Sequence, residues 1–159
     1  MQRLIRRSGR RGVVTVEMAM VAPLLIFLLF AIVEFGVLVR NVVSINEGAR
    51  EGTRAAAVGA VVTTIEARTY SALSGLDPGR AELDIEYRSW DHSSGSWGAW
   101  KSLTNSGAVN SAVAGDQIRV RVEYPHQIMI TGLFGSWASN DGNDDGIMTL
   151  NASTIMRRE

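Results

Sequence analysis

Hydrophobic and polar positions alternate with different periods along the chain, and the first stretch is almost entirely apolar. From Val13 to Val39 the only charged residues are Glu17 and Glu34. The uncharged part, Met18 to Val33, has 16 residues, which in a helix span about 24 Å at roughly 1.5 Å per residue. The pattern predicts a transmembrane helix over residues 13–39. Because the hydrocarbon layer is roughly 30 Å thick, Glu17 and Glu34 are expected near its interfaces or beside a partner.

Beyond the apolar run, apolar and small residues recur at spacings of three and four, which predicts that the helix continues outside the membrane. This stripe comprises Phe35, Leu38, Val42, Ile45, Ala49, Gly52 and Ala56. Its residues become smaller toward Ala56, which permits another helix or a sheet to pack closely there. A second amphipathic segment, about Thr64 to Leu73, ends at Ser74 and Gly75. We therefore expect a helical stem over residues 40–74.

After the turn signal Asp77-Pro78-Gly79, the period changes to two, which is typical of strands with one buried face. Three segments show it, with these apolar positions: Leu83, Ile85 and Tyr87; Ile118, Val120, Val122 and Tyr124; and Met148, Leu150, Ala152, Thr154 and Met156. The outer face of the first segment is mostly acidic and that of the second mostly basic, so we expect these two to be adjacent and antiparallel. Pro125 is expected to end the regular pairing of the second.

These elements predict an α+β fold. A long N-terminal transmembrane helix extends into a small antiparallel-sheet domain, residues 75–159, whose three or four strands cover the exposed half of the helix.

Charge predicts the orientation of the chain in the membrane. Arg3, Arg6, Arg7, Arg10 and Arg11 precede the apolar run, and positive residues before a first span are retained in the cytoplasm. Residues 1–12 are thus a cytoplasmic basic leader, and the sheet domain is extracytoplasmic. Five of the 16 basic residues lie in this leader, so 11 remain against 16 acidic residues, which argues against nucleic-acid binding. A cleaved signal peptide is disfavoured because Arg40 and a helical pattern follow the apolar run directly.

Composition and motifs argue against several kinds of chemistry. The chain has no cysteine, which excludes disulfides and thiolate chemistry. Its two histidines, His92 and His126, are far apart in the sequence and are both expected at the surface. No nucleotide-binding, zinc-protease or hydrolase motif occurs. We expect a protein that is not an enzyme and that needs no cofactor.

Two loops are candidate binding sites. Trp90, Trp97 and Trp100 lie in a Gly/Ser-rich stretch. We favour a hairpin in which these tryptophans pack locally. The alternative is a surface on which they bind glycan or another subunit. Asp141, Asn143 and Asp145 occupy positions one, three and five of a loop with glycine at position six, as in the first half of a calcium-binding EF-hand loop. Position twelve is Ala152, where a bidentate carboxylate is needed. An ordinary turn is favoured, and weak calcium binding is the alternative.

The segment Arg11-Gly12-Val13-Val14-Thr15-Val16-Glu17 resembles a type IV prepilin cleavage site. The resemblance implies that a prepilin peptidase of the membrane cuts between Gly12 and Val13, which makes Glu17 the fifth residue of the processed chain. It also implies that Glu17 neutralises the new α-amine of Val13 in the same or a neighbouring chain and so directs assembly. The alternative is that Glu17 only complements the helix macrodipole.

The longer run VTVEMAMVAPLLIFLLFAIVEFGVLVRNVVSINEGAREGTRAAA, residues 14–57, resembles the TadE-like family of minor pilins or pseudopilins of tight-adherence (Flp) pili. The shared features are VE at the membrane entrance, AP before an aliphatic run, EFG at the exit, and AREGTRAAA. The C-terminal TLNASTIMRRE is similar to the closing strand of the family. The resemblance implies that the α+β fold is pilin-like, and it implies a role in pilus assembly and surface attachment, with other pilins and pilus assembly proteins as partners. The alternative function is a membrane-anchored extracytoplasmic module that binds glycan or calcium outside any filament.

Overall fold

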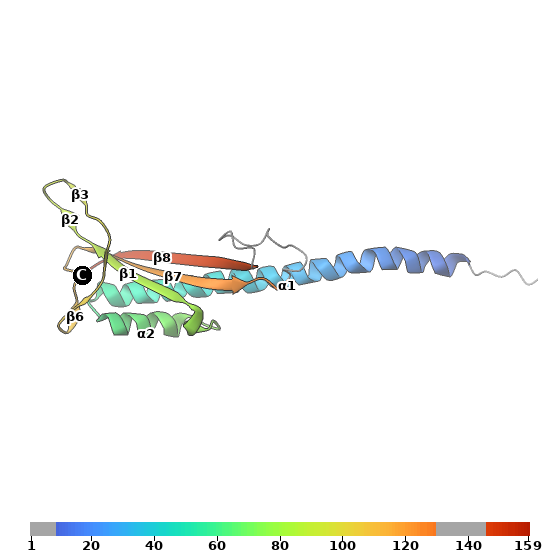
Figure 1. Ribbon diagram of the computed structural model, residues 1–159, viewed down its shortest axis with the longest axis horizontal. Helices are drawn as coiled ribbons and strands as arrows, with labels where there is room; N and C mark the ends of the chain where they lie inside the picture. Colours follow the sequence, from blue (N-terminus) through green and yellow to red (C-terminus); the bar gives the residue numbers. More distant parts are fainter. Residues whose placement is uncertain (1–8, 130–145) are drawn as a thin grey trace, which may run out of the picture. The chain divides into compact units, whose positions relative to one another are not determined.

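The computed structural model describes residues 9–129 and 146–159. Contacts divide the chain into two units, Met1–Val37 and Leu38–Glu159. The helices are α1 (Gly9–Ala57), α2 (Val62–Ala72) and the short 3-10 helix η1 (Pro78–Arg80). The strands are β1 (Glu82–Arg88), β2 (Trp90–Asp91), β3 (Ser96–Trp97), β4 (Lys101–Ser102), β5 (Asn105–Ser106), β6 (Val109–Asn110), β7 (Gln117–Gln127) and β8 (Ile147–Arg157). The predicted α+β fold, with a long apolar helix followed by a small antiparallel sheet, is confirmed (Figure 1).

In the first unit, the described residues belong to α1 alone. This helix is long and apolar enough to cross a membrane, and no residue of its most apolar window is buried. Helix is the conformation expected of such a sequence in lipid, because it satisfies every backbone hydrogen bond within one segment. Pro23 lies inside the helix, where lipid-embedded helices accept proline.

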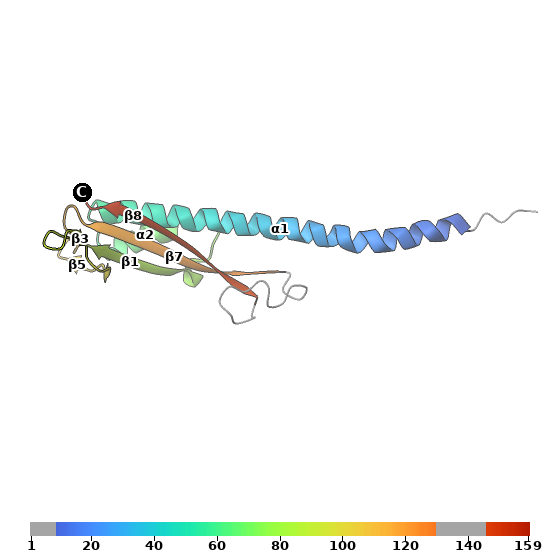
Figure 2. The ribbon, with the colours of Figure 1, turned by 90° about the horizontal axis from the view of Figure 1, so that it is seen from above.

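In the second unit, residues of α1 from Leu38 onward pack beside α2 and under the sheet (Figures 1 and 2). The predicted stripe is confirmed over most of its length: Ile45, Ala49, Gly52 and Ala56 are buried, and Leu38 and Val42 are half-buried. Phe35, predicted to belong to the same stripe, lies in the first unit and is 67% exposed. The stripe therefore extends less far toward the N-terminus than the spacing predicts, because helical period alone does not show where covering elements begin.

The main sheet has the order β4-β1-β7-β8. β1 and β7 are adjacent and antiparallel, as predicted, and Asp84 faces Arg121 while Glu86 faces Arg119. β8 pairs with β7 along its whole length. The inward positions of all three strands meet the helices, and Ile118, Val120 and Val122 are fully buried together with Ile45 and Ile65. Burying each such side chain contributes about 1.5–3 kcal/mol, so this shared core holds the helices to the sheet.

Pro125 does not end the pairing of β7, which corrects the prediction from the sequence. β7 continues to Gln127, and Pro125 faces Thr149 of β8. The pairing of β7 with β1 stops earlier, at Glu82 and Glu123. The carbonyl of Pro125 accepts a hydrogen bond from Arg80 at 3.0 Å. Since the amide position of a strand residue points to the same side as its carbonyl, the missing N–H of Pro125 faces the side where β1 is absent.

The C-terminal end of α1 is capped by residues from distant parts of the chain. Gly59 has φ +87°, and the amides of Gly59 and Ala60 donate to Ala56 and Ala55 in a Schellman arrangement. Asn110 of β6 donates to the carbonyls of Ala56 and Ala60 at 2.9 and 3.0 Å. The amide of Glu159 donates to the Ala57 carbonyl, so the C-terminus lies beside this end of α1 (Figure 2).

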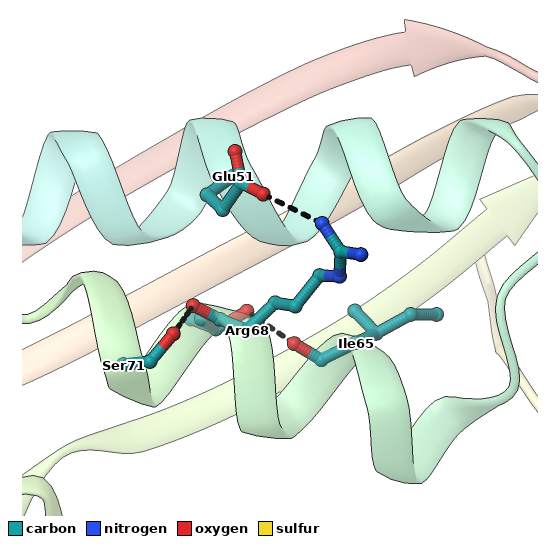
Figure 3. A network of polar contacts seen from close by, with 5 residues as sticks. Glu51, Ile65, Arg68 and Ser71 are labelled. Atoms are coloured by element: carbon teal, nitrogen blue, oxygen red, sulfur yellow. Dashed lines mark hydrogen bonds and ion pairs between the residues drawn. The ribbon is translucent and has the colours of Figure 1, made fainter.

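An ion pair joins α1 to α2 on the solvent side of their contact. Arg68 Nη1 lies 3.1 Å from Glu51 Oε1, and Ser71 donates to the Arg68 carbonyl in the same network (Figure 3). Both charged side chains are well exposed. Solvent screening limits such a pair to less than about 1 kcal/mol, so the packing beneath it dominates.

Candidate functional site

The proposed cleavage site lies on an uncovered part of α1. Both Gly12 and Val13 are exposed, and among the residues that the structure describes, no atom beyond the chain neighbours and the local helix backbone lies within 4 Å of a Cβ built at Gly12. Glycine is therefore not required at position 12 by packing within this chain. A glycine inside a helix costs about 1 kcal/mol relative to alanine, so the helix around Gly12 opens more easily than its neighbours. An exposed segment of helix that unwinds easily is a suitable site for a peptidase to cut.

Glu17 lies one helical turn beyond Val13, on the same face of α1, since residues four apart are stacked along a helix. Its side chain is exposed, and it forms no ion pair with any side chain between 12 and 129 or 146 and 159. The residues around it are exposed apolar side chains, among them Val14, Val16 and Met18. The carboxylate thus stands in an apolar setting that an amine at Val13 could reach in the same chain or in a neighbouring one.

The candidate calcium residues Asp141, Asn143 and Asp145 lie outside the described residues. Among residues 9–129 and 146–159, no three His, Cys, Asp or Glu side chains are grouped so as to hold a metal ion.

The predicted hairpin is confirmed for Trp90 and Trp97, whereas Trp100 lies between β3 and β4, outside the hairpin. β2 pairs with β3, which places Trp90 opposite Trp97, and their rings meet edge to face with centroids 5.3 Å apart. At the tip of this hairpin, Asp91 accepts hydrogen bonds from Ser93 and Ser94. The side-chain and backbone hydrogen bonds from Ser93 favour the ionised form and lower the pKa of Asp91 to about 2. This turn therefore fixes how the hairpin presents its tryptophans.

Arginines of the main sheet stack on two of the tryptophans. Arg88 lies 5.4 Å from the Trp97 centroid and 4.5 Å from that of Trp100. Arg119 lies 4.2 Å from Trp100, and Arg157 lies 5.5 Å from Trp97. We call these five residues the tryptophan–arginine cluster. Each cation–π contact at a partly exposed site contributes about 0.5–1 kcal/mol, so the cluster holds the loop against the outer face of the sheet.

The strand register explains why the arginines meet. Arg88 of β1 faces Gln117 of β7, which faces Arg157 of β8. Arg88 donates to Gln117 at 2.8 Å, and Arg119 forms a half-buried ion pair with Glu86. The tryptophans were singled out from the sequence, whereas the arginines that stack on them were not. The arginines lie at outward positions of the three predicted strands, and which of them meet is known only once the register of the strands is known.

His126 is buried, in contrast to the predicted surface position. It is 5% exposed, and its Nδ1 lies 3.0 Å from Asn41 Nδ2 of α1. The strand continues past Pro125, so His126 falls on the inward face with Tyr124 and Val122. His92 is exposed, as predicted.

Comparison with known families identifies one region of the chain. Residues 12–54 match the family model described as TadE-like protein. The resemblance recognised over residues 14–57 is thereby confirmed. The match covers most of α1 and does not extend to α2, the strands or the closing segment TLNASTIMRRE. No curated protein and no solved structure matched the chain.

Proposed function

We propose that this chain, with its TadE-like N-terminal region, is a minor pilin or pseudopilin that takes part in assembling a tight-adherence pilus. The proposal rests on one observation above all. The family match falls on a helix whose apolar residues between Val13 and Val39 are largely uncovered, whereas the same helix from Asn41 onward is built into a folded domain. The first half of such a helix must be surrounded by lipid or by neighbouring helices. A pilus subunit moves from the lipid of the membrane to the neighbouring helices of the filament.

Orientation follows from the leader arginines. Five of them precede the apolar segment, so the N-terminus stays in the cytoplasm and the sheet domain is extracytoplasmic, anchored to the cytoplasmic membrane by a single span. The prepilin peptidase then cuts between Gly12 and Val13, which removes the arginines and leaves a free α-amine. The mature subunit stays anchored by residues 13–39 until it joins other pilins.

Glu17 is the residue whose neutralisation favours correct docking of the subunit. An ionised carboxylate costs on the order of 2.5–3.5 kcal/mol at the bilayer centre by insertion scales, and less near an interface. Its exposed position on α1 lets the amine of Val13, in the same or a neighbouring chain, neutralise it. A subunit docked at the correct axial offset removes this cost, and a misplaced subunit does not.

Processing is tested by replacing Gly12 with leucine in cells that carry the pilus system. Since no atom of the described residues lies within 4 Å of a Cβ at Gly12, apart from the chain neighbours and the local helix backbone, the substitution is expected to leave the fold and membrane insertion intact. Intact mass of the extracted protein is expected to show the leader retained. Gly36→Leu is the matched control, because Gly36 lies on the same helix with equally empty surroundings, and its leader is expected to be removed. Unmodified protein that keeps its leader beside an active peptidase contradicts the proposal.

Assembly is tested with Glu17→Gln, which keeps the shape of the side chain and removes its charge. Expression, insertion and cleavage are expected to persist, while crosslinks to pilus components and recovery in sheared filaments are lost. Glu47→Gln serves as the control, since Glu47 is an exposed carboxylate in the folded part of the same helix. If the Glu17→Gln protein supports piliation as well as the unmodified one, the pairing role is wrong and only the macrodipole effect remains.

A further inference from the structure

An open cavity of about 470 Å³ lies beside the tryptophan–arginine cluster. Its walls come from three parts of the second unit: the β2–β3 hairpin, the loop before β7 and the end of β8. The lining residues are Ser89, Trp90, His92, Trp97, Arg157 and the loop Val113–Asp116. The volume falls within the range of small-molecule sites in proteins, about 300–1,000 Å³. The cavity thus has the size of a ligand site and is built entirely by the domain that the family match does not cover.

Two indole rings, together with Val113 and Ala114, provide the apolar part of the cavity. Pairing of β2 with β3 holds Trp90 opposite Trp97, and the edge-to-face angle of 77° keeps the two rings from covering one another. Trp90 remains 42% exposed. Indole rings combine an apolar face with an N–H donor. Flat rings held at the wall of an open cavity suit the C–H face of a sugar ring, whose hydroxyls point sideways to polar neighbours.

Polar groups around the rings supply both donors and acceptors. Ser89 and the exposed His92 lie on the hairpin side of the cavity. Asp116 lines the opposite side, but it is buried, and its Oδ2 already accepts the Val113 amide at 2.9 Å. The carboxylate of Asp116 therefore shapes the loop, and the neighbouring hydroxyl, imidazole and backbone groups remain for hydroxyl groups of a ligand.

Besides the buried Asp116, the charged lining residue of the cavity is Arg157. Its guanidinium is exposed, stacks over Trp97 and forms no ion pair with any residue in the described ranges. Arg88 of β1 also stacks over Trp97. Its side chain donates a hydrogen bond to the neutral side chain of Gln117. The carboxylate of Asp91 is held by serines at the hairpin tip. A planar guanidinium fixed on an indole face is a suitable bidentate partner for a carboxylate.

We propose that this cavity binds a saccharide that carries a carboxylate, with Trp90 and Trp97 against the sugar ring and Arg157 on the acid group. Such a site gives the protein a binding activity that is independent of its place in pilus assembly. A purely structural hairpin would be expected to bury its indoles and pair its arginines. Here one indole stays exposed and one guanidinium stays unpaired among the described residues, both at the same cavity.

Binding is tested on the full chain in detergent micelles by saturation-transfer difference NMR, with empty micelles as the blank. The probes are the trisaccharide of galacturonic acid and its neutral counterpart, the trisaccharide of galactose. The unmodified protein is expected to bind the acidic probe at least tenfold more tightly than the neutral one, with an affinity that falls as salt is added. Titration of each probe gives the two dissociation constants.

Two variants and one control identify the residues responsible. Arg157→Gln is expected to lower affinity for the acidic probe to that for the neutral one, while Trp90→Ala is expected to remove binding of both. Arg121→Gln is the matched control, because Arg121 also points outward from the sheet but does not line the cavity, and its binding should equal that of the unmodified protein. Circular dichroism checks that each variant is folded.

The proposal is overturned if neither probe gives a saturable signal above the empty micelles. Equal affinity for the two probes, or a preference for the acid that survives Arg157→Gln, overturns the assigned role of the guanidinium. Binding that survives Trp90→Ala places the ligand elsewhere. These results do not depend on leader processing or on Glu17, so they are distinguishable from failure of the pilus assignment.

Discussion

Replacing Gly52 with alanine is expected to strain the contact between α1 and α2. A Cβ at this position would collide with the hydroxyl of Thr69 and would lie 3.3 Å from a methyl carbon of Val120. Both neighbours are completely buried, so neither can move into solvent. Overpacking of this kind typically costs about 1–3 kcal/mol. Alanine recovers up to about 1 kcal/mol of helix propensity relative to glycine, which leaves a net destabilisation of about 1–2 kcal/mol.

A double-mutant cycle with Thr69→Ala isolates this contact. The Thr69 hydroxyl donates to the Ile65 carbonyl of its own helix. Removing this hydroxyl therefore breaks no hydrogen bond between α1 and α2. The lost burial of the threonine methyl group costs about 1 kcal/mol. In the double variant, the new methyl group of residue 52 occupies the space that the threonine leaves. The two changes together are expected to be less destabilising than their sum by about 1–2 kcal/mol. Additivity within about 0.5 kcal/mol would refute the reasoning.

The assay is denaturant unfolding of the full chain in mild detergent, followed by tryptophan fluorescence. All four tryptophans, at positions 90, 97, 100 and 137, belong to the second unit, so the signal reports on this unit. Gly48→Ala provides a graded comparison. Its Cβ would lie 2.6 Å from a methyl carbon of the buried Leu73 and 3.3 Å from the Thr69 carbonyl oxygen. These approaches are longer than the collision with the Thr69 hydroxyl at Gly52, so the cost is expected to be smaller than at Gly52.

Two further predictions concern the hairpin and the cap of α1. Because serine hydrogen bonds lower the pKa of Asp91 from 3.8 to about 2, the turn is stabilised by the ionised form above about pH 4 and loses this contribution as the pH falls toward 2. The carboxyl carbon of Asp91 in NMR should titrate near pH 2, and a midpoint near 3.8 would contradict the turn geometry. Asn110→Ala removes hydrogen bonds to the Ala56 and Ala60 carbonyls from a side chain that is 2% exposed. This change should destabilise the second unit by about 1–3 kcal/mol, whereas an unchanged denaturation midpoint would show that the cap is dispensable.

The sequence was most informative where a single period governs a long stretch. The absence of charge between Met18 and Val33 predicts a span without reference to anything distant, because solvation of each residue in lipid is a local property. Alternation over residues 82–88 and 117–124 likewise predicts which strand face is buried. Opposite charges on the two outer faces even predict that β1 and β7 are neighbours, since Glu86 and Arg119 attract across the pair.

Local patterns failed where burial or pairing depended on residues far away in the chain. His126 was expected at the surface because a proline precedes it, yet it bonds Asn41, 85 positions away. Pro125 is tolerated in β7 because β1 begins only at Glu82, opposite Glu123, so no residue of β1 pairs with Pro125; the sequence of β7 does not encode this register.

The sequence by itself predicted a helix long and apolar enough to cross a membrane and the buried faces of the strands, and the proposed processing site at Gly12 and Val13 rests on the sequence alone. Only the tertiary structure decided that Arg88 and Arg157 meet Trp97 and that an open cavity lies beside them. The physical reason is the range of the interactions. Transfer into lipid and helix or strand period act between near neighbours in sequence, whereas a stacked cluster requires three strands and a hairpin to be in register before any of its contacts exists.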